Sequence, residues 1–290
     1  MPISEALKAQ LLDYQRNEIT EHHIYQRLAE TVKEPENARI LADIAADELH
    51  HYGEWKAHTG QDVAPRRFDV WRYYWISRIF GFTFGIKLME RGEEGAQDNY
   101  QELAGSVPEA ERIAHDEHKH ENALIEMLDE ERLRYTSSIV LGLNDALVEL
   151  TGALAGLTLA LQDTRLIALT GSITGIAAAL SMAASEYLST QTEETDKHPV
   201  KASVYTGTAY ILTVLLLILP YLVLQNYFVS LACTLAVAIA IIAAFTYYIG
   251  VARDEPFRRR FLEMAVLSLG VAGLSFGVGF LVRTVLGVDV

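Results

Sequence analysis

The sequence has only one cysteine, Cys233, and few basic side chains for its length. A single cysteine within an apolar run excludes a disulfide framework and a thiolate metal site. Lysine and arginine number 24 against 38 aspartates and glutamates, which argues against a nucleic acid partner because phosphates require basic groups. The N-terminus lacks a basic segment followed by an apolar core, so we expect no cleaved signal and a first domain in the cytosol.

Charge and hydrophobicity change abruptly near residue 136. Up to Tyr135 there are 16 Lys and Arg against 27 Asp and Glu, net −11, with eight of the nine histidines. From Thr136 onward there are 8 against 11, net −3. The pattern predicts an acidic soluble domain over 1–135, suited to cation binding, and a membrane domain over 136–290.

Five apolar segments in the second part are long enough to cross a bilayer, which takes ~20 residues each. They cover residues 138–161, 166–188, 205–225, 228–250 and 264–286. An odd number of spans places the two chain ends on opposite sides of the membrane. Small residues at four-residue spacing predict close helix packing. These pairs are Gly152 and Gly156, Gly171 and Gly175, and Gly273 and Gly277.

Basic residues at the ends of the spans predict the orientation. With the first domain inside, the inner flanks hold Arg132, Arg134, Lys197, Lys201, Arg253, Arg258, Arg259 and Arg260. The outer flanks hold only Arg165 and Arg283. Because cytoplasmic flanks are enriched in Lys and Arg, we expect the N-terminal domain in the cytosol and the C-terminus outside.

Polar residues at membrane depth are functional candidates because burying them in lipid is expensive. The first span carries Asn144, Asp145 and Glu149, and the second carries Met182 and Glu186. Residues four apart share a helix face, so the carboxylates and the thioether predict a ladder for a divalent ion such as Fe(II). The alternative roles of these carboxylates are an interhelical hydrogen bond or a position at a helix end from which the side chain extends to the membrane surface, and that of Met182 is core packing.

Two motifs in these spans resemble the vacuolar iron transporter family. They are Leu143-Asn-Asp-Ala-Leu-Val148 and Ala179-Leu-Ser-Met-Ala-Ala-Ser-Glu-Tyr-Leu188, and Leu219-Pro-Tyr221 fits the same pattern. The resemblance implies a five-helix, dimeric, proton-coupled exchanger of Fe(II) and sometimes Mn(II). Within it, Asp145, Met182 and Glu186 match residues of the transport path.

The chain departs from eukaryotic members of that family between the second and third spans. Those members carry a long, Glu-rich, metal-binding insertion there, whereas this chain has only Ser189 to Lys201. We therefore expect another part of the chain to deliver the metal.

Residues 4–135 read as a bundle of four helices. We expect them over 4–32, 36–59, 68–104 and 109–134, with Pro35 and Pro108 at the starts of the second and fourth.

Each of these helices carries candidate metal ligands, and the pattern repeats. The second and fourth hold Glu48-x-x-His51 and Glu117-x-x-His120, the first holds Glu18 and Glu21, and the third holds Glu93. Residues three apart share a face, so each Glu and His can reach one ion. A Glu from each of two helices with a Glu-x-x-His from each of the other two is the ligand set of a di-iron carboxylate bundle.

The bundle resembles rubrerythrin-like members of the ferritin-like superfamily, since Tyr25 and Tyr100 follow Glu18 and Glu93 by seven residues. The resemblance implies terminal ligands at Glu18 and Glu93 and bridging ligands at Glu48 and Glu117. It implies iron at the site, with Mn or Zn as substitutes.

The chain also departs from that resemblance. Rubrerythrins place an extra Glu where this chain has Ala96, and Glu21 stands at the pseudo-symmetric position instead. Glu90 and Glu94 are alternative ligands on the third helix. No CxxC pair is present, so the electron-transfer module of true rubrerythrins is absent.

Other features receive structural interpretations. The histidines outside the repeated motif read as solvated or supporting: His22, His23, His50, His115 and His118. The aromatic stretch Val70 to Phe84 is too charged to span a bilayer. We assign it to core packing, with an interfacial belt or a dimer contact as alternatives.

Over the whole chain the sequence resembles bacterial membrane-bound ferritin-like exporters. We expect an all-α protein of the bacterial inner membrane, a homodimer in which a ferritin-like bundle captures, senses or oxidises iron and a five-helix domain exports Fe(II) against protons. The rival interpretation is a membrane-anchored ferroxidase or peroxide-scavenging enzyme, and a third is an iron-gated sensor or scaffold.

Overall fold

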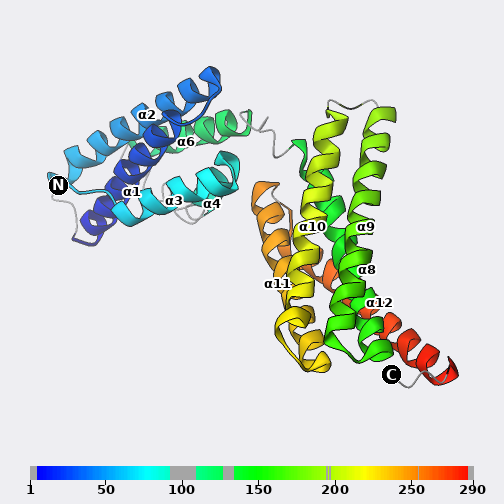
Figure 1. Cartoon of the computed structure of the whole chain (residues 1–290). Helices are drawn as coiled ribbons and strands as arrows, with labels where there is room; N and C mark the ends of the chain where they lie inside the picture. The colour runs from blue at the N-terminus through cyan, green and yellow to red at the C-terminus, as the bar shows by residue number, and fades with distance from the viewer. Residues whose placement is uncertain are drawn as a thin grey trace. The chain divides into compact units, whose positions relative to one another are not determined.

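The computed structural model describes residues 5–91, 109–126, 134–193, 195, 197–253 and 255–286. Within these residues every regular element is a helix, ten in all (Figure 1). The predicted all-α class is therefore confirmed. The chain divides into two compact units, Met1–Glu130 (unit 1) and Glu131–Val290 (unit 2).

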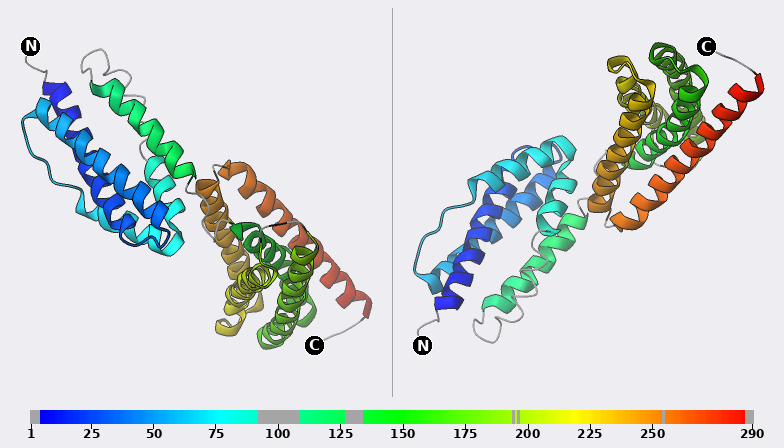
Figure 2. Two further views of the ribbon diagram at one scale, coloured as in Figure 1. Left: turned by 90° about the horizontal axis from the view of Figure 1, so that it is seen from above. Right: turned by 90° about the horizontal axis from the view of Figure 1, so that it is seen from below.

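Unit 1 contains five described helices. They are α1 (Glu5–Ala29), α2 (Pro35–Thr59), α3 (Arg67–Phe80), α4 (Phe82–Arg91) and α6 (Glu109–Glu126). α2 begins at Pro35, as the sequence predicts, and ends at Thr59, followed by Gly60 as a cap with a left-handed φ of 67°. α1 packs along α2 and α3, and α6 packs against α2 (Figure 2). Two clusters form the core, one around Leu28, Leu41 and Ile44, the other around Leu11, Trp55 and Ile113.

The single helix predicted over 68–104 is interrupted at Gly81. α3 ends at Phe80 and α4 begins at Phe82, with φ 103° and ψ 148° at the glycine between them. Only glycine adopts this backbone conformation easily, so the break is local to Gly81. The sequence did not reveal it, because an isolated glycine is often tolerated inside a helix.

Unit 2 contains five described helices, and each of the five predicted spans falls on a helix that is long and apolar enough to cross a membrane. They are α8 (Thr136–Leu161), α9 (Thr164–Thr192), α10 (Pro199–Val223), α11 (Tyr227–Ala252) and α12 (Phe257–Leu286). α8 is central, since it contacts each of the other four. Buried hydroxyls join the helices: Thr206 donates to the Ser138 carbonyl at 2.9 Å, and Ser268 donates to the Leu147 carbonyl at 2.8 Å.

Glycines allow α8 and α12 to approach closely. A Cβ added at Gly156 would lie 3.0 Å from the Ser275 carbonyl oxygen, and one added at Gly152 would lie 2.9 Å from a Val271 methyl. The predicted close packing at these two glycines is confirmed. Within the described part of a single chain, no atom of another helix lies within 4 Å of a Cβ added at Gly273 or Gly277, so the close packing predicted there is not found.

Two glycines of α12, Gly279 and Gly277, provide a test of this packing. A methyl group at Gly279 would clash with the Gly156 carbonyl, whereas Gly277 is open. Overpacking costs about 1–3 kcal/mol, and Gly→Ala gains up to about 1 kcal/mol of helix propensity. Gly279→Ala should therefore lower the thermal midpoint of the purified protein in detergent, while Gly277→Ala should leave it unchanged or raise it. Equal midpoints for the two variants would contradict the packing of α12 on α8.

Candidate metal centre

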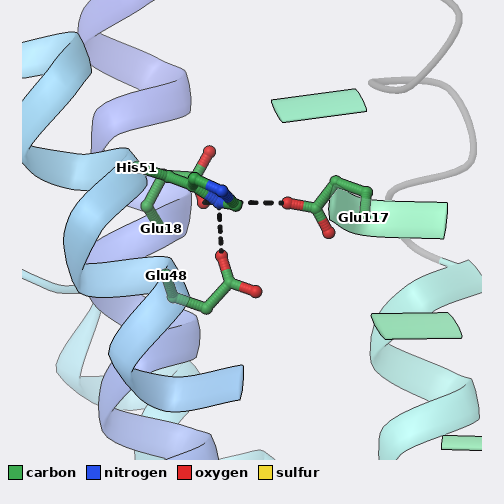
Figure 3. Close-up of side chains that lie close together, drawn as sticks. All are labelled: Glu18, Glu48, His51 and Glu117. Carbon is green, nitrogen blue, oxygen red and sulfur yellow. Dashed lines mark ion pairs between the residues drawn. The ribbon is translucent and has the colours of Figure 1, made fainter. Parts of the chain in front are cut away.

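Four acidic and histidine side chains from three helices of unit 1 meet in its interior. They are Glu18 of α1, Glu48 and His51 of α2, and Glu117 of α6 (Figure 3). One potential ligand atom from each lies within 4.8 Å of those of the others. The Nδ1 atom of His51 lies 3.5 Å from Glu48 Oε2, 3.6 Å from Glu117 Oε1 and 3.8 Å from Glu18 Oε2. Such a group can hold a cation.

His120 extends this group on the α6 side. Its Nδ1 atom lies 3.1 Å from Glu48 Oε1 and 3.8 Å from Glu117 Oε2. The rings of His51 and His120 are 6.0 Å apart between centroids. Glu48 and Glu117 thus lie between the two histidines, the position that a bridging carboxylate would occupy in a two-metal centre.

Burial and unmet hydrogen bonds indicate that the group is built for a ligand. Glu18, Glu48 and His51 are at most 2% exposed. Glu48 Oε2, His51 Nδ1 and His120 Nδ1 are buried without a hydrogen-bond partner in the described part of the chain. Carboxylate and imidazole atoms that converge in this way fit a divalent iron, manganese or zinc ion.

The pKa values of these side chains show how they balance one another's charge. Burial raises the pKa of Glu18 well above its usual value. Burial by itself lowers the pKa of His51, but Glu117, Glu18 and Glu48 outweigh it and raise the value to about 12. Burial also lowers the pKa of His120, but Glu117 and Glu48 outweigh this effect and raise the pKa to about 10. Protonated histidines therefore compensate the carboxylates, and a bound metal ion would replace those protons.

Supporting residues hold the ligands from outside, and the sequence analysis missed them. His120 Nε2 hydrogen-bonds Asp47 Oδ2 at 3.1 Å, and His51 Nε2 lies 3.7 Å from Asp116 Oδ2. Each aspartate precedes the glutamate of one repeat and faces the histidine of the other. The repeated Asp-Glu-x-x-His was the available signal. Trp55 Nε1 donates to Glu18 Oε1 at 2.9 Å, and no sequence signal marked that contact.

The remaining predicted ligands of unit 1 stand apart from this group or outside the described residues. Glu21 is buried and lines a separate cavity of about 160 Å³ with Asn17, Arg66 and Arg72. Glu90 lies at the end of α4, and its side chain is not described. Glu93 and Glu94 lie outside the described residues, so the contribution of the third predicted helix stays a prediction.

Two membrane-depth carboxylates of unit 2 have defined hydrogen bonds. Glu186 of α9 is 9% exposed and accepts a 2.5 Å hydrogen bond from Ser138 Oγ of α8. Glu149 of α8 is exposed in the single chain and accepts a 2.9 Å hydrogen bond from Tyr210 of α10. Ser138 and Tyr210 were not predicted, because a hydroxyl partner on another helix has no sequence signature.

The other residues of the predicted transport path lie on the same two helices, α8 and α9. Asn144 and Asp145 are half-buried on α8, and Met182 of α9 packs against the apolar core. Asp145, Glu149 and Glu186 do not gather into a group like that of unit 1 within the described part of one chain. A path along these residues thus stays a prediction.

These observations define an integral membrane protein with five candidate spans and a buried glutamate–histidine cluster that could bind metal. Residues 136–197, which contain α8 and α9, match the model of the VIT family. A match to this family implies a membrane transporter of iron or manganese ions. No curated protein is similar enough to the chain to count as a match. The family match does not reach unit 1, so a ferritin-like origin of that unit remains an interpretation of its ligands.

The cluster in unit 1 predicts a loss of metal when its central carboxylates are removed. The Glu48→Ala/Glu117→Ala double variant should lose most of the iron that the full-length protein retains through purification, because two of the shared ligands are absent. Metal content per chain, measured by mass spectrometry, checks this. Asp43→Ala/Glu111→Ala removes two exposed acids from the same helices and should keep its iron. Unchanged iron in the first variant would refute the site.

The aspartates behind the histidines predict a smaller effect. Asp47→Asn should weaken metal affinity by about 10–100-fold, the usual effect of losing an outer-shell partner of a ligating histidine. Competition with a chelator of known affinity measures the change. Asp43→Asn, at an exposed position one turn earlier on α2, is the control. Equal affinities in the two variants would show that Asp47 does not support His120.

Proposed function

We propose that this protein exports Fe(II), with Mn(II) as an alternative cargo, from the cytosol in exchange for protons. The observation that carries the proposal is a buried carboxylate–histidine group in the same chain as helices that match the VIT family. A dedicated metal-binding unit joined to a metal-transport unit is best explained by transfer of the same ion.

Unit 1 is the part that captures the ion, senses it or oxidises it. Glu18, Glu48 and Glu117 with His51 and His120 would hold iron, whose one-electron redox chemistry would then be available at the site. The short connection in unit 2 supports a donor role for unit 1. α9 ends at Thr192 and α10 begins at Pro199, which leaves no room for a long metal-binding insertion between these helices.

Unit 2 moves the ion along carboxylates that bind either a cation or a proton. In a low-dielectric surrounding a carboxylate is rarely left charged and unpaired, so metal entry displaces a proton and proton entry releases the metal. Asp145 and Glu149 on α8 and Glu186 on α9 are the proposed steps, with Asn144 and Met182 as further ligands. The hydrogen bonds from Tyr210 and Ser138 orient two of these carboxylates.

A homodimer completes the path in this proposal. Glu149 is exposed near the middle of an apolar helix of the single chain. A charged group at that depth avoids lipid and faces a protein interface or a water-filled cavity. A second copy placed over this face of α8 would provide such an interface.

The proposed location is the inner membrane of a bacterium with unit 1 in the cytosol. The loops and helix ends on the side of residue 134 carry most of the basic residues, among them Arg258, Arg259 and Arg260 at the start of α12. The enrichment of Lys and Arg on cytoplasmic flanks supports this orientation.

The second candidate function is a membrane-anchored ferroxidase or peroxide-scavenging enzyme. The buried glutamates and histidines of unit 1 favour it, because they supply the ligand types that a di-iron oxidase requires. The carboxylates at membrane depth speak against it, because an anchor needs no Asp145 or Glu149.

Asp145→Ala tests the transport proposal. The variant should lose nearly all Fe(II) flux into proteoliposomes under a proton gradient, because a step of the path is removed, while unit 1 keeps its metal. Fe(II) uptake and metal content per chain are the two measurements. Glu263→Ala, which removes an exposed carboxylate of α12, should transport normally. Flux in Asp145→Ala equal to that of the unaltered protein would overturn the assignment.

The same assay with the Glu48→Ala/Glu117→Ala variant separates the roles of the two units. Loss of flux in this variant as well would make unit 1 an obligatory donor, and normal flux would make it an accessory. No flux in the unaltered protein, together with oxygen consumption on Fe(II) addition, would favour the anchored enzyme.

A further inference from the structure

Helix α3 of unit 1 exposes a continuous row of large apolar side chains. Phe68, Trp71, Trp75 and Ile79 are 67%, 55%, 46% and 59% exposed. We name these four residues the α3 stripe. They are three or four residues apart, so they lie on one face of the helix, while Val70 and Ser77 on the other face are buried. Contiguous exposed apolar surface of this kind marks an interaction site.

Basic residues border the α3 stripe, although unit 1 as a whole is acidic. α3 contains Arg67, Arg72 and Arg78 but only one acid, Asp69. Arg78 follows Trp71 by seven residues and Arg67 precedes it by four, so both exposed arginines lie beside the stripe, whereas Arg72 lines the cavity of Glu21. Residues 1–135 carry a net charge of −11. With three arginines and one aspartate, the helix that exposes the tryptophans therefore carries a net positive charge within an acidic unit.

This combination matches an anionic lipid surface better than another protein copy. A helix with a bulky apolar face between basic residues lies in the plane of the bilayer interface, where tryptophan is enriched and anionic headgroups attract arginine. In a symmetric pair of α3 helices the arginines would face arginines, which is unfavourable. The rest of unit 1 offers acidic surface, which an anionic membrane repels.

The chain itself keeps unit 1 near a membrane. α6 ends at Glu126 and the first candidate span begins at Thr136. Covalent attachment to a membrane segment raises the effective concentration of a weak binding surface at the bilayer.

We propose that the α3 stripe inserts into the headgroup region of an anionic bilayer and docks unit 1 on the membrane surface. The binding partner is the lipid surface itself, with Phe68, Trp71 and Trp75 in the interface and Arg67 and Arg78 on the phosphates. Docking does not depend on transport, and it would hold the metal cluster at a fixed height above the bilayer.

The tryptophans of the chain provide the test without any label. The three are Trp55, which is fully buried, and Trp71 and Trp75 of the α3 stripe, so the spans contribute none. The full-length protein is reconstituted in vesicles of phosphatidylcholine and phosphatidylglycerol with brominated acyl chains, which quench tryptophan on contact. Unbrominated vesicles of the same composition give the reference emission.

We expect brominated lipid to quench most of the emission of Trp71 and Trp75. Trp71→Tyr/Trp75→Tyr retains only Trp55 and should show several-fold less quenching. Arg67→Glu/Arg78→Glu keeps every tryptophan and should also lose most of the quenching, whereas Lys33→Glu/Arg39→Glu, an equal charge change at exposed positions elsewhere in unit 1, should not. Metal content confirms that each variant is folded.

Two results would overturn the proposal. Equal emission in brominated and unbrominated vesicles would place the α3 stripe outside the bilayer. Emission that is blue-shifted and unquenched, and that depends on protein density in the membrane, would assign the stripe to contact with a second copy.

Discussion

Glu48 is 1% exposed between two histidines from different helices, and unit 1 is organised around the compensation of its charge. A buried carboxylate is destabilising by several kcal/mol unless a cation or hydrogen-bond donors surround it. The histidines contribute to this compensation, since the neighbouring carboxylates raise the pKa of His51 to about 12 and that of His120 to about 10. A divalent ion would provide this compensation more directly, because it contacts all the carboxylates at once. The packing of α1, α2 and α6 thus fits ion binding.

Carboxylates in the apolar helices of unit 2 also need compensation of their charge, because lipid solvates a charge as poorly as the protein interior does. Glu186 is buried and has Ser138 as donor, and Glu149 is exposed with Tyr210 as donor. In the proposed exchange, each of these carboxylates would bind a proton or a cation in turn. Carboxylates that accept either partner are the chemical requirement for exchange of metal and protons. Both units therefore contain carboxylates whose charge needs compensation. In unit 1 these carboxylates converge in one group, and in unit 2 they lie apart.

The sequence indicated which candidate ligands of unit 1 share a helix face, but not which residues surround them. Glu48 and His51 share a helix face because they are three residues apart, and this local rule needs no tertiary information. The convergence of Glu18 and Glu117 on His51 followed from the repeated pattern on several helices. By contrast, Asp47 faces His120 and Asp116 faces His51 across the bundle, and Trp55 donates to Glu18, contacts that depend on how α2 packs against α1 and α6.

Composition and periodicity by themselves determined the all-helical class, the five spans and the helix faces of the metal ligands, because hydrophobic length and helical spacing are local properties of the chain. Tertiary structure decided which glycines approach a neighbour: Gly156 and Gly279 do, whereas Gly273 and Gly277 do not. It also placed the helix break at Gly81 and turned Trp71 and Trp75 outward, although the sequence favoured core packing for that stretch. Such outcomes depend on the face that each helix presents to its neighbours, which is set by packing of the whole unit.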